Sequence, residues 1–523
     1  MKKSKAILIT PLVLILLVLV FPSQVFAAEE SEHNIVEQPG VDAEDMTRLE
    51  ATSTPEPEPH HHLEGAFLDW FHNPADWIEM GADERFKIIV AKNIDTLSDD
   101  LNNNRENHWN FIRQRMRWWQ KFKLDEDVDF NSRLVWEFRH WDEGPTGAGQ
   151  QRDKRVDFDE ILFDQFNITW RNMFGTPVKG VFGRQDIILG RGWLVLDGTP
   201  LDGSRTIYFD AMRFTYDWAE KNTVFDLILI HQEAAEDAWL KPINDEDRHV
   251  TEQDENGIIF YVTNKSLEKT QFEGYFIYKN DNPIDVTAAD EPVPWPSAVW
   301  SRKAEIFTFG GAVEHRFDDH WSARAEGAMQ VGDKEEPFTG RMADLEAFGF
   351  VSKLDYNFND EKKNNLHIGY EYLSGDDPDT RDYEQFDPLW GEWPQWSELY
   401  VYTYNLETMI GETTNLHRFN VGHSFKPAPN WQINTDYHAL WAAENTSDQA
   451  RYAYPWYNVV SNDFNTSNDS KFRGHLFTLW VKWQCCPQLR WHWLAEYFSP
   501  GSYYSQAIRD GAYFLRFNIE YTF

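Results

Sequence analysis

Basic residues at alternate positions are the most informative candidates for chemistry in this sequence. Four of them fall in one short stretch: Arg113, Arg115, Arg117 and Lys121. The other face of that stretch would carry apolar residues: Ile112, Met116, Trp118 and Phe122. Because successive side chains of a β-strand point to opposite faces, this spacing predicts a strand with one cationic face. A row of cations attracts anions, and the planar guanidinium of arginine can hold both oxygens of a carboxylate.

Further charged candidates follow in later stretches. The stretch 129–141 places apolar residues on one face and three charged residues on the other: Arg133, Glu137 and Arg139. A later stretch, 161–172, adds the single base Arg171. Two roles are open for this set. The bases either contact a passing anion, or pair with acids such as Glu137 and Asp186 and brace a wall.

A period-two pattern from Glu84 to the C-terminus predicts the strands that would position these residues. We predict eighteen strands: 84–93, 108–122, 129–141, 161–172, 177–189, 206–217, 222–232, 257–265, 270–280, 301–316, 320–332, 344–358, 364–374, 414–425, 430–442, 471–484, 488–498 and 511–523. An even number is expected of a single-chain bacterial barrel. The predicted fold is therefore all-β, a closed antiparallel transmembrane barrel.

The connections between these strands alternate in length. Every second connection is tight, as at Gly175-Thr176 and Cys485-Cys486-Pro487, whereas the others run from about a dozen to about forty residues. The longest lies between Gly375 and Thr413. A barrel with both termini in the periplasm has this alternation of short periplasmic turns and long extracellular loops.

The C-terminal stretch 511–523 has the pattern of a closing strand. Its odd positions from Tyr513 to Phe523 are aromatic or aliphatic, and the even positions from Arg516 to Thr522 are polar. A terminal phenylalanine on the lipid face is typical of the signal that outer-membrane assembly machinery recognises. We expect outer-membrane lipid and the barrel-assembly machinery as partners of this strand.

The composition fits a membrane barrel with a wet interior. Aromatic residues make up 16% of the 523 residues, although hydrophobic residues reach only 41% and the mean hydropathy is -0.61. A barrel needs apolar residues only at alternate positions and gathers aromatic rings at two interfacial girdles. The high aromatic content and the low mean hydropathy both follow from this architecture.

The first 83 residues are expected to precede the barrel. Residues 1–28 combine early lysines, an apolar run and small residues near Ala27, which predicts a secretory signal peptide. Residues 29–63 are acidic and poor in aromatics, which favours a disordered linker. Residues 64–83 form a predicted short amphipathic segment, at the membrane edge or plugging the barrel. Cleavage of the signal would deliver the barrel 84–523 to the outer membrane of a Gram-negative-type bacterium.

The formal net charge of -37 lies mostly in three acidic segments: 29–83, 232–256 and 376–398. The last two are expected loops that could bind divalent cations. Overall acidity without a basic exposed domain disfavours nucleic acid as a partner. No metal-ligand spacing and no hydrolase or nucleotide-binding motif occurs, so we predict no metal site, no catalytic residue and no cofactor.

One pair of motifs resembles a known family. Gly183-Arg184-Gln185, followed after a loop by Phe209-Asp210-Ala211-Met212-Arg213-Phe214-Thr215-Tyr216, is similar to the paired signature of the alginate export family of outer-membrane barrels. The similarity covers most of residues 64–523. Members of that family are eighteen-stranded barrels with an arginine-rich lumen that carry an anionic exopolysaccharide outward. The resemblance implies luminal roles for Arg184 and Arg213.

Three functions follow as hypotheses. The first is an outer-membrane pore, not an enzyme, whose basic lumen passes an anionic polysaccharide or small anionic solutes, because a low-dielectric wall focuses a positive field into the channel. The second is a general diffusion porin. The third is a structural or adhesive barrel whose acidic loops bind cations.

Overall fold

The computed structural model describes a large part of the chain from Trp70 to Phe523. The described ranges are 70–99, 107–144, 156–196, 208–234, 239–244, 250–284, 301–336, 340–377, 379–408, 411–445, 470–506 and 508–523. The predicted signal peptide 1–28 and linker 29–63 lie outside the described residues.

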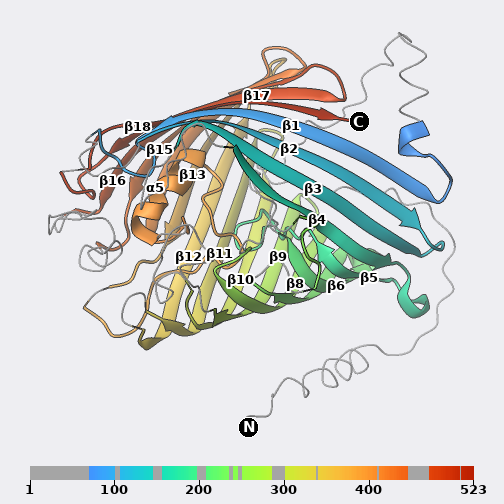
Figure 1. Ribbon diagram of the computed structural model, residues 1–523. Coiled ribbons are helices and arrows are strands. Elements are labelled where there is room, and N and C mark those ends of the chain that lie inside the picture. The colour runs from blue at the N-terminus through green and yellow to red at the C-terminus, as the bar shows by residue number, and fades with distance from the viewer. Residues whose placement is uncertain are drawn as a thin grey trace. The chain divides into compact units, whose positions relative to one another are not determined.

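In the described ranges, eighteen antiparallel strands form one closed sheet. They are β1 (Ile78–Lys92), β2 (His108–Lys123), β3 (Val128–Glu143), β4 (Val156–Trp170), β5 (Val178–Gln185), β6 (Phe209–Trp218), β7 (Thr223–Gln232), β8 (Gln253–Leu267), β9 (Thr270–Pro283), β10 (Ala304–Arg316), β11 (Trp321–Glu335), β12 (Met342–Asn357), β13 (Asn365–Leu373), β14 (Leu416–Phe425), β15 (Trp431–Trp441), β16 (Phe472–Gln484), β17 (Leu489–Pro500) and β18 (Ala512–Thr522). Each strand pairs with the next, and β18 pairs with β1 (Figure 1). Closure satisfies backbone groups that an open edge would leave unpaired in lipid.

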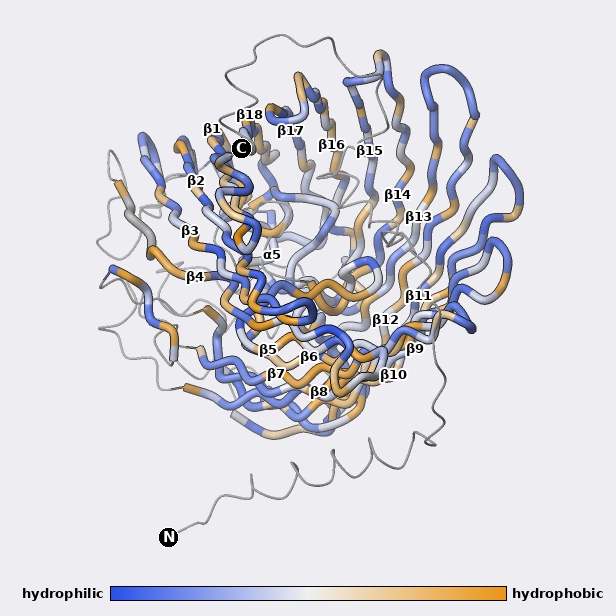
Figure 2. The backbone as a smooth tube through the Cα atoms, turned by 90° about the vertical axis from the view of Figure 1, so that its right-hand side faces the viewer, coloured by the Kyte–Doolittle hydropathy of each residue, from blue (hydrophilic) through white to orange (hydrophobic). Residues whose placement is uncertain are grey.

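Side-chain alternation gives the strands an apolar outer face and a polar inner face. In β2, Met116 and Trp118 are exposed, whereas Arg113 and Arg115 are buried. Figure 2 shows apolar and polar residues alternating along strands around the barrel. Exposed apolar and buried charged side chains reverse the pattern of a soluble protein, as expected where lipid surrounds the outer face.

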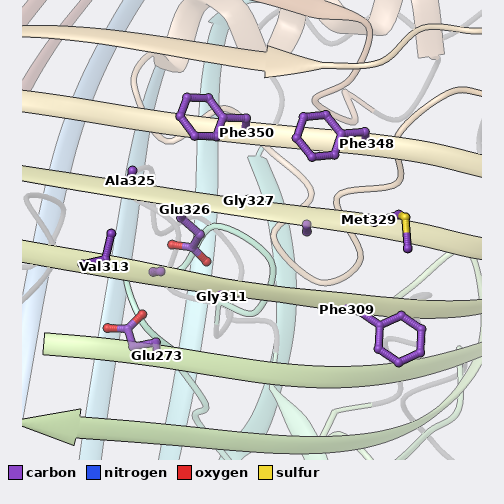
Figure 3. A pocket seen from close by; sticks show the side chains of 12 residues that line it. Glu273, Phe309, Gly311, Val313, Ala325, Glu326, Gly327, Met329, Phe348 and Phe350 are labelled. Atoms are coloured by element: carbon purple, nitrogen blue, oxygen red, sulfur yellow. The ribbon is translucent and has the colours of Figure 1, made fainter.

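The outer face has a shallow groove across β10, β11 and β12. Gly311 and Gly327 leave space there between larger side chains that include Phe309, Met329 and Phe348, and the groove measures about 480 Å³ (Figure 3). The three larger side chains are each about half exposed. This groove therefore faces the hydrocarbon side of the wall.

The first strand and the last residue meet at one rim. Ala82 N donates to Phe523 O at 2.6 Å, and Phe523 N donates to Ala82 O at 2.8 Å. The ring of Phe71 lies 5.6 Å from that of Phe523, and Trp70 and Trp77 are exposed. The described part of segment 64–83 thus lies at this rim beside the C-terminal residue, and its residues 78–83 belong to β1.

Two connections fold into the barrel and pack on its inner face. They are residues 186–196, between β5 and β6, and 374–415, between β13 and β14, which includes α5 (Glu398–Thr408) (Figure 1). The connections meet in a parallel bridge between Val195 and Trp390. Their buried residues join one hydrophobic cluster with inner-face residues of the strands. Among helices of the described residues, none has the length and apolar character needed to cross a membrane.

All eighteen predicted strands are present, with some different ends. β1 begins at Ile78 and not at residue 84, and β5 ends at Gln185 and not at residue 189. β11 and β12 continue beyond their predicted ends, to Glu335 and from Met342, so the connection between them is shorter than expected. In β11 and β12 backbone pairing continues through charged residues such as Asp333 and Asp344, where the apolar alternation is absent, and this explains their extensions.

Candidate pore lining

Arg113, Arg115 and Arg117 lie on the inner face of β2, as the alternation predicted. Arg117 Nε donates to both oxygens of Asp83 on β1, at 3.0 and 2.9 Å. Arg115 Nη2 lies 3.4 Å from Asp83 Oδ1, and Arg113 Nε donates to Glu137 on β3. Each of these arginines therefore has a carboxylate within reach, which is the bracing arrangement.

The inner face of five neighbouring strands carries an excess of positive charge. The strands are β16, β17, β18, β1 and β2. Nine basic residues of this face are Lys482, Arg490, Arg516, Arg85, Lys87, Arg113, Arg115, Arg117 and Lys121, and Arg473 and Lys123 add to them at the ends of β16 and β2. Four acidic residues share the face: Glu496, Glu520, Glu79 and Asp83. We call the nine residues the basic wall. It exists because β18 pairs with β1, which joins residues from both ends of the barrel sequence.

His492 on β17 lies at the centre of the basic wall. Its electrostatic neighbours are four cations: Arg516, Lys87, Lys482 and Arg490. Its Nε2 is buried and has no hydrogen-bond partner among the residues that the structure describes. The charged neighbours of Arg115 are mixed: Arg117 and Arg85 carry the same charge, and Asp83 and Glu520 carry the opposite charge. Like charges at such short range strengthen the positive field along this side of the lumen.

Two other predicted residues are held by acids on the inner face. Arg133 donates to Asp164 at 2.7 Å and to the two oxygens of Asp186 at 2.8 and 3.0 Å. Arg213 Nε donates to Asp226 Oδ1 at 2.8 Å. These contacts favour bracing over direct contact with a solute.

The remaining predicted bases lie nearer the ends of the strands. Arg171 follows the last residue of β4, in the turn to β5, and donates to Asp129 Oδ2 at 2.6 Å. Lys121 Nζ lies 3.6 Å from the same carboxylate oxygen and is about one third exposed. Arg139 is opposite Arg113 in the β2–β3 register. Arg171 therefore belongs to the rim of the barrel.

The structure contradicts the predicted luminal position of Arg184. Its register partner on β4 is Phe166, on the same face as the exposed Ile168, so Arg184 follows the outer face. Pairing of β4 with β5 stops at Phe166 and Arg184, which leaves a seam beside the upper part of β4. Arg184 Nη1 donates to Phe163 O at 3.0 Å across this seam. Its Nε and Nη2 donate to the two oxygens of Asp210 at 3.1 and 3.2 Å.

Two aromatic rings cover the guanidinium of Arg184. The ring centroids of Tyr208 and Trp239 lie 3.6 and 5.5 Å from it, and Trp239 Nε1 donates to Asp210 Oδ2 at 2.9 Å. Gly183 has φ +117°, and a Cβ there would lie 2.4 Å from Phe166 O. The motif Gly183-Arg184-Gln185 therefore builds the seam between β4 and β5. Interrupted pairing is the physical reason why the luminal assignment was wrong.

A small charged pocket holds the connection 374–415 against the ends of β8, β9 and β11. Its charged lining residues are Glu252, Glu255, Lys279, Asp281, Arg302, Lys334, Asp387, Glu392 and Glu412. Lys334 Nζ donates to Asp387 Oδ2 at 2.5 Å, and Trp390 Nε1 donates to Glu255 Oε2 at 2.7 Å. Burial, together with neighbouring carboxylates, raises the pKa of Glu252 to about 7 and that of Glu392 well above its usual range. Burial therefore favours the protonated forms of both carboxyl groups.

The wall formed by β9, β10 and β11 has a more balanced charge. Arg324 Nη2 donates to Glu273 at 2.6 Å and to Glu326 at 2.8 Å. Arg191, from the connection 186–196, donates to Glu314 at 2.7 Å. Figure 3 shows Glu273 and Glu326 on these strands. Local pairing of this kind leaves less net positive charge than the basic wall has.

Sequence reasoning missed five members of the basic wall: Arg85, Lys87, Lys482, Arg490 and Arg516. Their alternation was visible in 84–93, 471–484, 488–498 and 511–523, and Arg516 was already assigned to the polar face. The missing step was to pair the last strand with the first, which closure requires. Within the described residues, no group of three or more His, Cys, Asp or Glu side chains is arranged to hold a metal ion.

Comparison with known families decides the relationship that the motifs suggested. The alginate export family model matches residues 78–513, which is most of the chain. This chain belongs to the alginate export family. No curated protein matches its sequence. The family and the closed barrel together make this alginate export family member an outer-membrane pore protein.

Solved structures show the same fold at low sequence identity. Acinetobacter baumannii OccAB2 superposes on this alginate export family member with a TM-score of 0.52 and 8% identity, covering 85% of this chain and 98% of OccAB2. Pseudomonas aeruginosa OccK8 (OprE) gives a TM-score of 0.50 and 9% identity, covering 85% of this chain and 98% of OccK8. At such identities the likeness concerns the fold alone.

Proposed function

We propose that this outer-membrane pore conducts anions along its basic wall and passes an anionic polysaccharide or small anionic solutes. The basic wall carries the proposal: nine basic residues share one inner face with four acidic ones. Its cations form a series along neighbouring strands, which suits weak and replaceable contacts with a moving anion. A tight single site would instead hold the solute. We propose no catalytic step, because the charged groups form ion pairs typical of a channel wall.

The test is the reversal potential of the purified pore in planar bilayers under a KCl gradient. The wild-type pore is expected to prefer chloride, and replacing Arg115 and Arg117 by Ser should reduce that preference on the order of threefold. Lys362→Ser, in the exposed turn between β12 and β13, is the matched control and should leave the preference unchanged. A cation-selective wild-type pore would overturn the proposal.

A general diffusion porin is the second candidate, and the ion pairs of Arg117, Arg133 and Arg213 favour it. A braced wall offers fewer cations to a solute. The two candidates differ in their response to an added oligouronate. An anion pathway should show concentration-dependent block of the chloride current, whereas a general diffusion pore should conduct equally with and without the saccharide.

Export and assembly complete the proposal. Cleavage of residues 1–28 would release the chain to the periplasm, and the barrel-assembly machinery would then recognise the C-terminal strand and insert the barrel into outer-membrane lipid. Divalent cations at the acidic segments 232–256 and 376–398 would reduce repulsion between these loops and an anionic cargo. Addition of EDTA to the bilayer experiment tests the last point through a change in oligouronate block.

A further inference from the structure

Helix α5 places two carboxylates against the inner wall of the barrel. Figure 1 shows α5 within the ring of strands, and its residues Leu399, Tyr400 and Tyr404 are fully buried. Glu398 begins the helix and Glu407 lies in its last turn. At a rise of about 1.5 Å per residue, the two carboxylates are separated by roughly 13 Å along the axis.

Each carboxylate meets an arginine of the wall strands. Arg516 Nη1, a member of the basic wall, donates to Glu398 Oε1 at 2.6 Å. Arg473 Nη2 of β16 donates to Glu407 Oε2, which also accepts from Tyr503 OH at 3.1 Å. Both arginine side chains are 0% exposed. The chain therefore covers two of its own inner arginines with its own carboxylates.

The position of α5 has supports other than the charge of Glu398. Thr403 Oγ1 donates to Ile94 O at 2.9 Å, and Leu399 N donates to Glu496 Oε2 at 2.8 Å. The hydroxyl oxygens of Tyr400 and Tyr504 lie 3.0 Å apart. An amide at position 398 would remove one negative charge from the wall while these contacts keep the helix in place.

We propose that Glu398 sets the anion selectivity of the pore by acting as a tethered carboxylate that occupies the Arg516 end of the basic wall. This inference rests on the proposed anion pathway. An internal carboxylate lowers the positive potential seen by a passing anion, because opposite charges at hydrogen-bonding distance largely cancel at longer range. Other members of the wall stay accessible, since Lys121 and Arg490 are each about one third exposed.

The decisive variant is Glu398→Gln, which keeps the size of the side chain and an oxygen acceptor but removes the charge. The reversal potential in a KCl gradient is expected to shift toward chloride, with a permeability ratio raised on the order of threefold. Block by an added oligouronate should occur at lower concentration. Glu361→Gln, at an exposed residue of the turn between β12 and β13, is the matched control and should match the wild type.

A second variant separates selectivity from structure. In Glu398→Gln/Arg516→Gln one charge of each sign is removed, so the permeability ratio should return toward the wild-type value. A purely structural role for Glu398 predicts a lower unfolding midpoint with an unchanged permeability ratio, and that result would overturn the inference. An equal shift in Glu361→Gln would overturn it as well.

The failure of this inference can be told from the failure of the proposed function. A wild-type pore that prefers anions, combined with no shift in Glu398→Gln, removes only the role of Glu398. A wild-type pore that prefers cations and ignores the replacement of Arg115 and Arg117 removes the anion pathway itself, and the tethered-carboxylate role with it.

Discussion

Asp83 on β1 and Arg117 on β2 are direct register partners, and Arg117 Nε donates to both carboxylate oxygens of Asp83 at 3.0 and 2.9 Å. The same carboxylate lies 3.4 Å from Arg115 Nη2. One acid therefore serves two bases of the wall. This ratio shows how the inner face can be braced and still keep an excess of positive charge.

Replacing Asp83 by Asn tests that double role. The variant loses the acid shared by Arg115 and Arg117, so we expect stability to fall by about 1–3 kcal/mol while chloride preference rises. Urea unfolding in detergent and the reversal potential measure the two effects. Asp319→Asn, at an exposed turn residue, should change neither. A stable variant with unchanged selectivity would contradict the role given to Asp83.

Arg184 should matter for stability and not for ion selectivity. Arg184→Ala leaves Asp210 without its two hydrogen bonds and Phe163 O without a donor, which should cost about 2–4 kcal/mol. Arg184→Lys should recover little, because an ammonium group lacks the planar fork of the guanidinium. A reversal-potential shift as large as that of Arg117→Ser would return Arg184 to the pore lining.

The charged pocket around Glu252 predicts a pH dependence. The folded-state pKa of Glu252 is raised to about 7 by burial and by the nearby Glu255 carboxylate. Its stabilising contribution is therefore complete below its unfolded pKa near 4.5 and is lost as pH rises through 7. Burial raises the pKa of Asp387, but Lys334 and Lys279 lower it by more, so its net pKa is lowered. Asp387 therefore acts in the opposite direction, and only at more acidic pH.

Unfolding midpoints at pH 5 and pH 8 measure this effect. The wild type should lose stability between these values, and Glu252→Gln should lose clearly less, because an amide does not release a proton. Asp318→Asn, in the turn between β10 and β11, serves as the control and should follow the wild type between pH 5 and pH 8. An equal pH dependence in Glu252→Gln and the wild type would remove Glu252 as its source.

The terminal Phe523 should be required for efficient assembly. Its deletion removes both backbone hydrogen bonds to Ala82 and the ring contact with Phe71. We expect a strong reduction of folded barrel in the outer membrane, measured as the fraction that keeps its fast mobility on unheated gels. Phe523→Tyr keeps the backbone bonds and an aromatic ring, and it should assemble nearly as well as the wild type. Normal assembly after deletion would exclude this role.

The sequence by itself determined the strands and their two faces. Alternation depends only on the direction in which neighbouring side chains point, so the inner position of Arg113, Arg115 and Arg117 and the apolar face of 511–523 were readable from local spacing. The even strand number, with alternating connection lengths, also required both ends of the barrel to meet at one rim. Ala82 and Phe523 confirm this.

Tertiary structure alone decided which charges share a wall and where single residues leave the pattern. Lys482 and Arg516 become neighbours of Lys87 around His492 only because β18 pairs with β1. Arg184 follows the outer face because the pairing of β4 with β5 stops there, an event that alternation does not encode. Helix α5 reaches the inner wall through a long connection, whose path depends on packing with distant strands and not on local spacing.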